Sequence, residues 1–215
     1  MAARVKVCGL TRPEDAGYAA GAGAAYLGVV FAGGPRQVGL PQAAAVVAAS
    51  RGIPVLGVFG GTSVGDILSL AREIGLSGAQ LHGPYGREDA ARLRATGLIV
   101  WRVVRIASPA DLDLLGEASL DADAVVVEPR VPHAEGGGGV PLGLAVAVEA
   151  RRRLASVRMA LAGGLTPDTV NAAMALVRAD VADVSSGVES LPGIKDHQKI
   201  ARFLEAVLGR SPTVG

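Results

Sequence analysis

The chain has 215 residues, a formal net charge of +1 and a single cysteine, Cys8. The balance of 21 basic and 20 acidic residues leaves no basic stripe, which excludes the usual electrostatic footprint of a nucleic-acid-binding protein. One cysteine cannot form an internal disulfide, and no apolar run reaches the ~20 residues that a membrane span needs. With no signal-peptide pattern, we expect a soluble cytoplasmic protein with no membrane partner.

Short apolar runs alternate along the chain with segments of helical pattern. The expected strands are 4–8, 26–31, 54–59, 78–82, 98–104, 123–128, 157–162 and 181–184. The expected helices are 13–22, 41–51, 63–74, 86–95, 108–117, 143–154, 167–177 and 196–208. Strict alternation requires parallel strands with crossover helices. Because no GxGxxG follows the first strand, we predict a single-domain (β/α)8 TIM barrel rather than an open doubly wound sheet, with residues 1–210 as the domain and 211–215 as a C-terminal tail.

The sequence Gly-Leu-Thr occurs at two strand ends, residues 9–11 and 164–166, and each time a proline and an acid follow. We expect the hydroxyls of Thr11 and Thr166 to cap the next helices, since threonine can accept from free N–H groups and proline fits a first turn. This strand-to-helix unit puts Cys8 at the end of the first strand, where the chemistry of such barrels takes place.

Cys8 is the first candidate catalytic residue. A free cysteine is commonly a small buried hydrophobe, but its place at the mouth of the barrel favours a general base. To act as a base the thiol has to ionise, which nearby positive charge promotes. Lys6, two residues earlier on the same side of the strand, can supply that charge; alternatively it is a structural lysine paired with a barrel acid.

Glu128 is the second candidate, because it ends the apolar run 124–127 and is followed by Pro129. A carboxylate at the end of a buried strand is costly unless it has a partner or a task, and an apolar pocket would favour its protonated form, which suits a general acid. The alternative is an exposed loop acid. Asp123 is a weaker candidate because it lies at the opposite end of the same strand.

Two further side chains are expected to line the pocket. Arg36 lies in a Gly-Pro loop after the second strand, where a guanidinium suits a carboxylate clamp, although a surface arginine is the alternative. His82 ends the fourth strand and either lines the pocket or is structural. Neither His133 nor His197 has metal-ligand spacing with the other or with Cys8, so we predict no metal site.

The loops after the seventh and eighth strands are expected to bind phosphate, as they do in many such barrels. Glycine lets backbone N–H groups approach an anion, and serine adds a hydroxyl donor. The expected phosphate-binding residues are Gly163, Gly164, Ser186 and Gly187. The alternative is that these glycines only form turns.

A separate run of four glycines, at 136–139 after the sixth strand, predicts either a mobile loop over the active face or a flexible spacer.

Blocks spread over nearly the whole chain resemble the phosphoribosylanthranilate isomerases of tryptophan biosynthesis. The matching blocks are Lys6-Val7-Cys8-Gly9-Leu10-Thr11, Gly28-Val29-Val30-Phe31 with Pro35-Arg36, Gly57-Val58-Phe59, Gln80-Leu81-His82-Gly83, Leu161-Ala162-Gly163-Gly164-Leu165, Asp183-Val184-Ser185-Ser186-Gly187-Val188-Glu189 and Pro192-Gly193-Ile194-Lys195-Asp196. The resemblance implies a cofactor-free enzyme that converts the small molecule N-(5-phosphoribosyl)anthranilate to the 1-deoxyribulose product by an Amadori rearrangement.

The same resemblance implies residue roles. A cysteine at the place of Cys8 is the family's general base, an aspartate at the place of Glu128 is its general acid, and the arginine matching Arg36 contacts the anthranilate. The chain departs from the family at three places. Glutamate replaces that aspartate, Val140 replaces a lysine after the glycine run, and glycines 60–61 replace an asparagine.

Two other functions stay open from the sequence. The altered loop after strand six is also compatible with a degenerate barrel that binds a phosphorylated ligand without rapid chemistry. A barrel isomerase of the histidine pathway generally carries an aspartate at the end of strand one, where this chain has Cys8, which argues against that function. We expect a monomer or a homodimer.

Overall fold

The computed structural model describes residues 3–130 and 143–209 of the chain. Several sequence-based predictions therefore lie outside the described residues: the glycines at 136–139, Val140, His133 and the tail 211–215.

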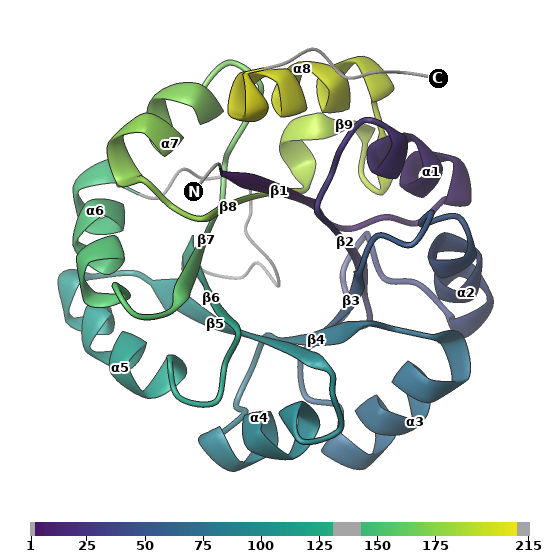
Figure 1. The fold of residues 1–215 in the computed structure, drawn as a ribbon, viewed down its shortest axis with the longest axis horizontal. Helices are drawn as coiled ribbons and strands as arrows, with labels where there is room; N and C mark the ends of the chain where they lie inside the picture. The colour runs from purple at the N-terminus through teal and green to yellow at the C-terminus, as the bar shows by residue number, and fades with distance from the viewer. Residues whose placement is uncertain (1–2, 131–142, 210–215) are drawn as a thin grey trace.

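Eight parallel strands form a closed barrel in which each strand pairs with the next and the last returns to the first (Figure 1). The strands are β1 (Arg4–Val7), β2 (Tyr26–Val30), β3 (Val55–Phe59), β4 (Gly78–Leu81), β5 (Ile99–Ile106), β6 (Ala124–Pro129), β7 (Arg158–Ala162) and β8 (Val181–Val184). The ring closes between β8 and β1, where Lys6 pairs in register with Asp183. The predicted TIM barrel is confirmed.

Helices surround the barrel and cover the outer faces of its strands (Figure 1). They are α1 (Pro13–Gly21), α2 (Leu40–Ala48), α3 (Val64–Ile74), α4 (Arg87–Arg94), α5 (Leu114–Ala118), α6 (Leu144–Arg153), α7 (Val170–Val177) and α8 (His197–Leu208). After β8 the chain forms a 3-10 turn, η2 (Ser186–Val188), and a small antiparallel hairpin of β9 (Glu189–Leu191) and β10 (Ile194–Lys195). Within the described ranges, no helix is long and apolar enough to cross a membrane.

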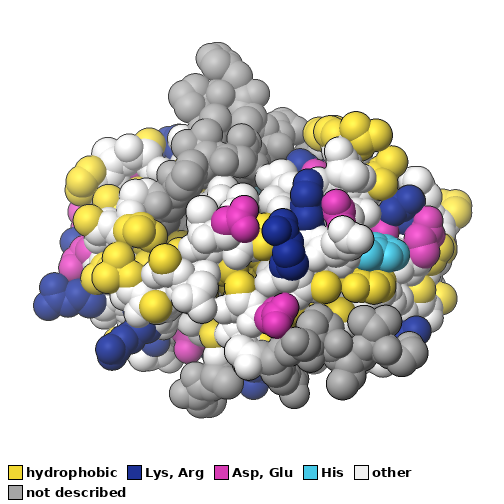
Figure 2. Space-filling model, turned by 90° about the horizontal axis from the view of Figure 1, so that it is seen from above, with side chains coloured by type: hydrophobic (Ala, Val, Ile, Leu, Met, Phe, Trp, Pro, Cys, Tyr) yellow, Lys and Arg dark blue, Asp and Glu magenta, His cyan; other side chains and the backbone are white. Residues whose placement is uncertain are grey.

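The core has two layers, because parallel strands are buried on both faces. The outer layer lies between strands and helices, and the abundant alanines of the helices let them pack closely on the sheet. The inner layer fills the barrel and contains Tyr26, Leu56, Trp101, Ala124, Val126, Ala160, Ala162 and Val181. On the surface, acidic and basic side chains are interspersed on the face shown in Figure 2 rather than gathered by sign.

Both predicted threonine caps are wrong. α1 begins after Arg12 with no side-chain cap, and the Thr11 hydroxyl instead donates to the carbonyl oxygen of Gly193 at 2.6 Å, which ties the β9–β10 hairpin to the end of β1. Thr166 donates its N–H to the hydroxyl of Thr169 in a separate turn, so α7 begins only at residue 170.

The helix expected over 108–117 is also different. It is split into a 3-10 turn, η1 (Pro109–Asp113), and the short α5.

Candidate active site

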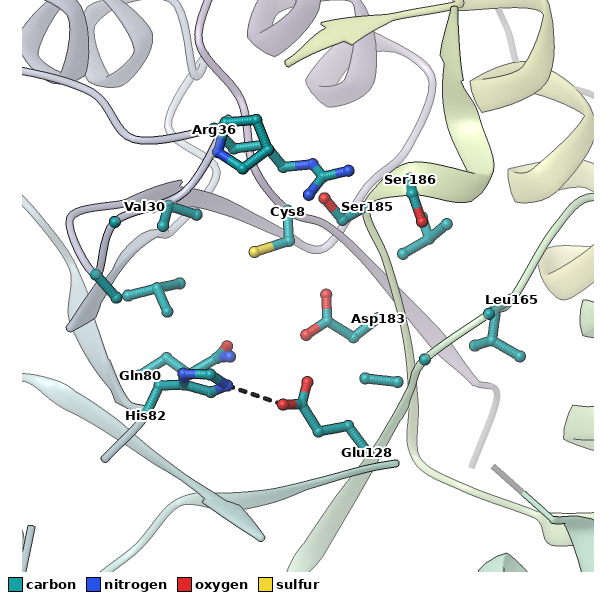
Figure 3. Close-up of a pocket in the computed structure, with 18 residues that line it drawn as sticks. Cys8, Val30, Arg36, Gln80, His82, Glu128, Leu165, Asp183, Ser185 and Ser186 are labelled. Atoms are coloured by element: carbon teal, nitrogen blue, oxygen red, sulfur yellow. Dashed lines mark hydrogen bonds and ion pairs between the residues drawn. The ribbon is translucent and has the colours of Figure 1, made fainter. Parts of the chain in front are cut away.

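A pocket opens at the carboxyl ends of the strands, and Figure 3 shows its lining. This is the end of the barrel at which enzymes of this fold carry their active sites. The structure brings seven of the eight predicted site residues to its wall: Cys8, Arg36, His82, Glu128, Gly163, Gly164 and Ser186. The eighth, Gly187, lies behind the wall, where a Cβ would collide with the carbonyl oxygen of Leu165, so its lack of a side chain lets the β7 and β8 loops meet.

Cys8 is partly exposed in the pocket, and its thiol is free. Gly28 on the neighbouring strand makes room for it, since a Cβ there would lie 2.8 Å from the Cys8 sulfur and 3.2 Å from Cε of Lys6. The sulfur and the Lys6 side chain therefore lie side by side over this glycine. The positively charged side chains of Lys6, Arg36 and Lys195 all interact electrostatically with the Cys8 sulfur.

Lys6 is completely buried, and its Nζ donates to both carboxylate oxygens of Asp183, at 2.9 and 3.1 Å. This confirms the structural alternative stated for Lys6, and the pair also bears on the site because Asp183 lines the pocket next to Cys8. Burial alone would lower the pKa of Lys6, but the charge of Asp183 and the interaction with Cys8 outweigh it and raise the pKa above its ordinary value. The lysine therefore stays charged beneath the thiol.

Arg36 already holds a carboxylate in this structure, that of Glu189 on β9. Its Nε donates to Oε1 at 2.7 Å and its Nη2 to Oε2 at 2.8 Å, a bidentate pair. Lys195 on β10 donates to the same Oε1 at 2.8 Å. Burial would raise the pKa of Glu189, but both cations bring it below its ordinary value. The pair fixes one edge of the guanidinium and leaves Nη1 and one Nη2 hydrogen for the pocket.

Glu128 is buried at the end of β6 and bound by two side chains. Its Oε1 accepts from His82 Nε2 at 2.8 Å and from Arg105 Nε at 3.1 Å, while Arg105 Nη2 lies 3.0 Å from Nδ1 of the same imidazole. Burial alone would raise the pKa of Glu128, but the bond from His82 and the charge of Arg105 bring it below its ordinary value. The expectation that the pocket raises this pKa is therefore wrong: the free site holds a carboxylate.

The loops after β7 and β8 present free backbone donors. Gly163 and Gly164 have φ of 93° and 67°, which side chains rarely adopt, and neither N–H donates to another described residue. Ser186 begins η2, so its N–H has no partner inside that turn. Its hydroxyl is likewise unused within the described ranges, so the two loops form a cradle of donors for an anion.

Two other residues considered in the sequence analysis, the weaker candidate Asp123 and His197, do not line the pocket. Asp123 sits at the opposite end of β6 and pairs with Arg94 at 3.1 Å. His197 Nε2 donates to the Asp15 carboxylate at 2.9 Å, and its ring stacks on Tyr18, which joins α8 to α1. In the part of the chain that the structure describes, no three His, Cys, Asp or Glu side chains are grouped as a metal site.

Sequence reasoning missed Arg105, Glu189, Lys195 and Asp183 as members of the site. One signal was available for Arg105, which lies opposite Glu128 in the β5–β6 register. The partners of the others are far away in the sequence: Arg36 and Glu189 are 153 positions apart.

Comparisons with known proteins agree with this geometry. The family described as N-(5'phosphoribosyl)anthranilate (PRA) isomerase matches residues 5–206. A relative from Paracoccus denitrificans, N-(5'-phosphoribosyl)anthranilate isomerase, is 39% identical over 95% of this chain and 96% of its own.

Two solved structures are similar over 97% of this chain and 100% of theirs. The phosphoribosyl anthranilate isomerase of Thermotoga maritima has a TM-score of 0.86 at 30% identity. A phosphoribosyl anthranilate isomerase in complex with reduced 1-(o-carboxyphenylamino)-1-deoxyribulose 5-phosphate has a TM-score of 0.83 at 28% identity. On this evidence, the chain belongs to the phosphoribosylanthranilate isomerase family.

Proposed function

We propose that this enzyme isomerises N-(5-phosphoribosyl)anthranilate to 1-(2-carboxyphenylamino)-1-deoxyribulose 5-phosphate in tryptophan biosynthesis, by an Amadori rearrangement without a cofactor. The observation that carries the proposal is the placement of three features in one pocket. The Cys8 thiol and the Glu128 carboxyl point into it from opposite sides, and the donor-rich loops after β7 and β8 form a third wall (Figure 3).

Both ends of this substrate are anionic, and the pocket offers a site for each. The phosphate fits the N–H groups of Gly163 and Gly164 and the hydroxyl of Ser186. The anthranilate carboxylate fits the pocket edge of Arg36, whose other edge is held by Glu189. With its two ends bound in this way, the ribose is placed between the thiol and the carboxyl group.

The chemistry needs one acid and one base. Glu128 donates a proton to the ribose ring oxygen, the C1–O bond breaks, and the nitrogen lone pair forms an iminium at C1. The Cys8 thiolate then removes the proton from C2, and those electrons neutralise the iminium to give an enolamine. Loss of the C2 hydroxyl proton and protonation of C1 yield the ketone. Placed acids and bases of this kind contribute about 10²–10⁴-fold each.

The state of the free site sets one condition on this mechanism. Because His82 and Arg105 lower the pKa of Glu128, the carboxyl group has to take up a proton before it can act as the acid. Closure of the pocket by substrate removes water from the carboxylate, which favours that uptake.

The test is loss of anthranilate fluorescence when the purified protein meets phosphoribosylanthranilate, with the ketose product identified by mass spectrometry. The proposal expects turnover by wild type and a loss of about 10²–10⁴-fold in Cys8→Ala. A rise in melting temperature with substrate, but no product at any pH, would instead support the degenerate binding barrel. Turnover of the histidine-pathway aminosugar phosphate alone would assign the barrel to that reaction.

A further inference from the structure

Gln80 is a polar side chain inside the barrel to which no role has been assigned so far. It lies on β4, two residues before His82 and on the same face, and its side chain reaches the pocket (Figure 3). It is only 5% exposed, and its Oε1 is buried without a hydrogen-bond partner among the described residues. It is the one buried side-chain polar atom in those ranges that is left in this state.

An unpaired amide at this position is costly. Leaving a buried acceptor unsatisfied costs about 1–3 kcal/mol, and an apolar residue of the same size would avoid that cost. The in-register neighbours, Val58 on β3 and Trp101 on β5, form surroundings that would suit such a residue. Packing therefore gives no reason for an amide here, whereas a ligand that bonds to it does.

The charged groups of the site do not serve as that partner, because they are bound to one another. Lys6 donates to Asp183, and His82 and Arg105 bind Glu128. The partner of Gln80 has to come from the contents of the pocket.

We propose that Gln80 is a specificity residue that binds a secondary hydroxyl of the substrate's sugar. An amide offers one acceptor and one donor group, and a sugar hydroxyl both donates and accepts, so the match holds for either orientation of the amide. A carboxylate or an aromatic edge cannot supply the donor that Oε1 lacks. Gln80 also lines the same pocket as Cys8 and Glu128, so a sugar held between those two groups shares that pocket with the amide.

This inference rests on the proposed function, and a binding experiment separates the two. The probes are reduced 1-(o-carboxyphenylamino)-1-deoxyribulose 5-phosphate, the ligand of a related structure, and three versions of it that lack the hydroxyl at C2, C3 or C4. Calorimetry measures the affinity of each for wild type and for Gln80→Met, which keeps the length of the side chain and removes its hydrogen bonds.

We expect the loss of one particular hydroxyl to weaken binding to wild type by roughly tenfold relative to the complete analogue. Gln80→Met should bind that deoxy analogue and the complete analogue with equal affinity. Equal losses in the two proteins for all three hydroxyls would overturn the role of Gln80 and leave the proposed function intact. Failure of wild type to bind the complete analogue would overturn both proposals.

The stability of the free protein gives a second readout that a packing role would not produce. Because Gln80→Met removes an unsatisfied buried amide, its melting temperature should equal or exceed that of wild type although its affinity falls. Gln198→Met, the same change on the exposed surface of α8, is the matched control and should leave affinity unchanged. A large loss of stability in Gln80→Met would indicate a structural role and contradict the proposal.

Discussion

The proposed mechanism uses two sides of the pocket, a base side at Cys8 and an acid side at Glu128, and positive charge on both sides has opposite consequences for the two proposed roles. On the base side, the charges of Lys6, Arg36 and Lys195 interact with the Cys8 sulfur. On the acid side, Arg105 and His82 bind Glu128. Positive charge stabilises the deprotonated form of either group.

For a thiol that works as a base, that form is the active one. For a carboxyl group that works as an acid, it is the inactive one. The cations beside Cys8 therefore suit its proposed role as a base, whereas Glu128 is held in place by His82 and Arg105 and has to take up a proton before it can act as the proposed acid.

The largest expected effect is that of Cys8→Ala, which removes the base. We expect kcat to fall by about 10²–10⁴, because no other described group at this wall replaces the thiolate. Stopped-assay product formation measures the loss. Calorimetry with the reduced analogue should show binding within a few-fold of wild type, because the donors of the β7 and β8 loops remain. Near-wild-type turnover would exclude Cys8 as the base.

Glu128→Gln tests the acid side in the same way. The amide keeps the size of the side chain and cannot supply a proton, so we expect a loss in kcat of about 10²–10³. Glu128→Asp serves as the comparison, since it restores the residue usual in the family but draws the carboxyl group away from His82 and Arg105. The activity of Glu128→Asp should lie between that of wild type and that of Glu128→Gln. If the glutamine variant keeps nearly full activity, another group donates the proton.

Lys6→Met separates the structural role of the Lys6–Asp183 pair from its catalytic role. The change leaves a buried carboxylate alone, which costs about 3–5 kcal/mol in the free energy of unfolding, measured by urea denaturation. Adding Asp183→Leu should recover most of that stability but not the activity, because Cys8 still lacks the charge beneath it. Recovery of activity in the double variant would show that Lys6 has no part in ionising the thiol.

The smallest expected effect is a shift in pH dependence. Activity that needs protonated Glu128 is lost as the pH rises through the pKa of that group. Arg105 contributes to lowering this pKa, so Arg105→Met should raise it and move the alkaline limb of kcat/KM to higher pH. Arg87→Met, at an exposed ion pair with Asp121, is the control. If the alkaline limb of kcat/KM does not move in Arg105→Met, then Arg105 does not act on the group whose titration limits activity.

The architecture could be predicted from the sequence because local patterns specify each strand and helix of the barrel. Each strand is a short apolar run and each helix has its own periodicity, so all eight strands lie where they were predicted. One of the errors occurs where a distant residue competes for a local group. The hydroxyl of Thr11 had a plausible target in the next helix, but it bonds to Gly193, 182 positions away.

The site was predicted in part for the same reason. Cys8 and Glu128 end strands, and strand ends meet at one face of a barrel. The protonation state of Glu128 could not be predicted, because it depends on partners brought together by folding. Without Arg105 and His82 in view, an apolar pocket argues for a raised pKa of Glu128, whereas the structure has it lowered.

The closure of the barrel between its first and last strands has a consequence for synthesis on the ribosome. Lys6 leaves the exit tunnel 177 positions before Asp183, its partner in the closed barrel. Until β8 has emerged, the nascent chain has no counterion for a lysine that the finished barrel encloses. We therefore expect partial barrels to stay open and without activity until the last strand docks, which prevents premature closure around an incomplete pocket.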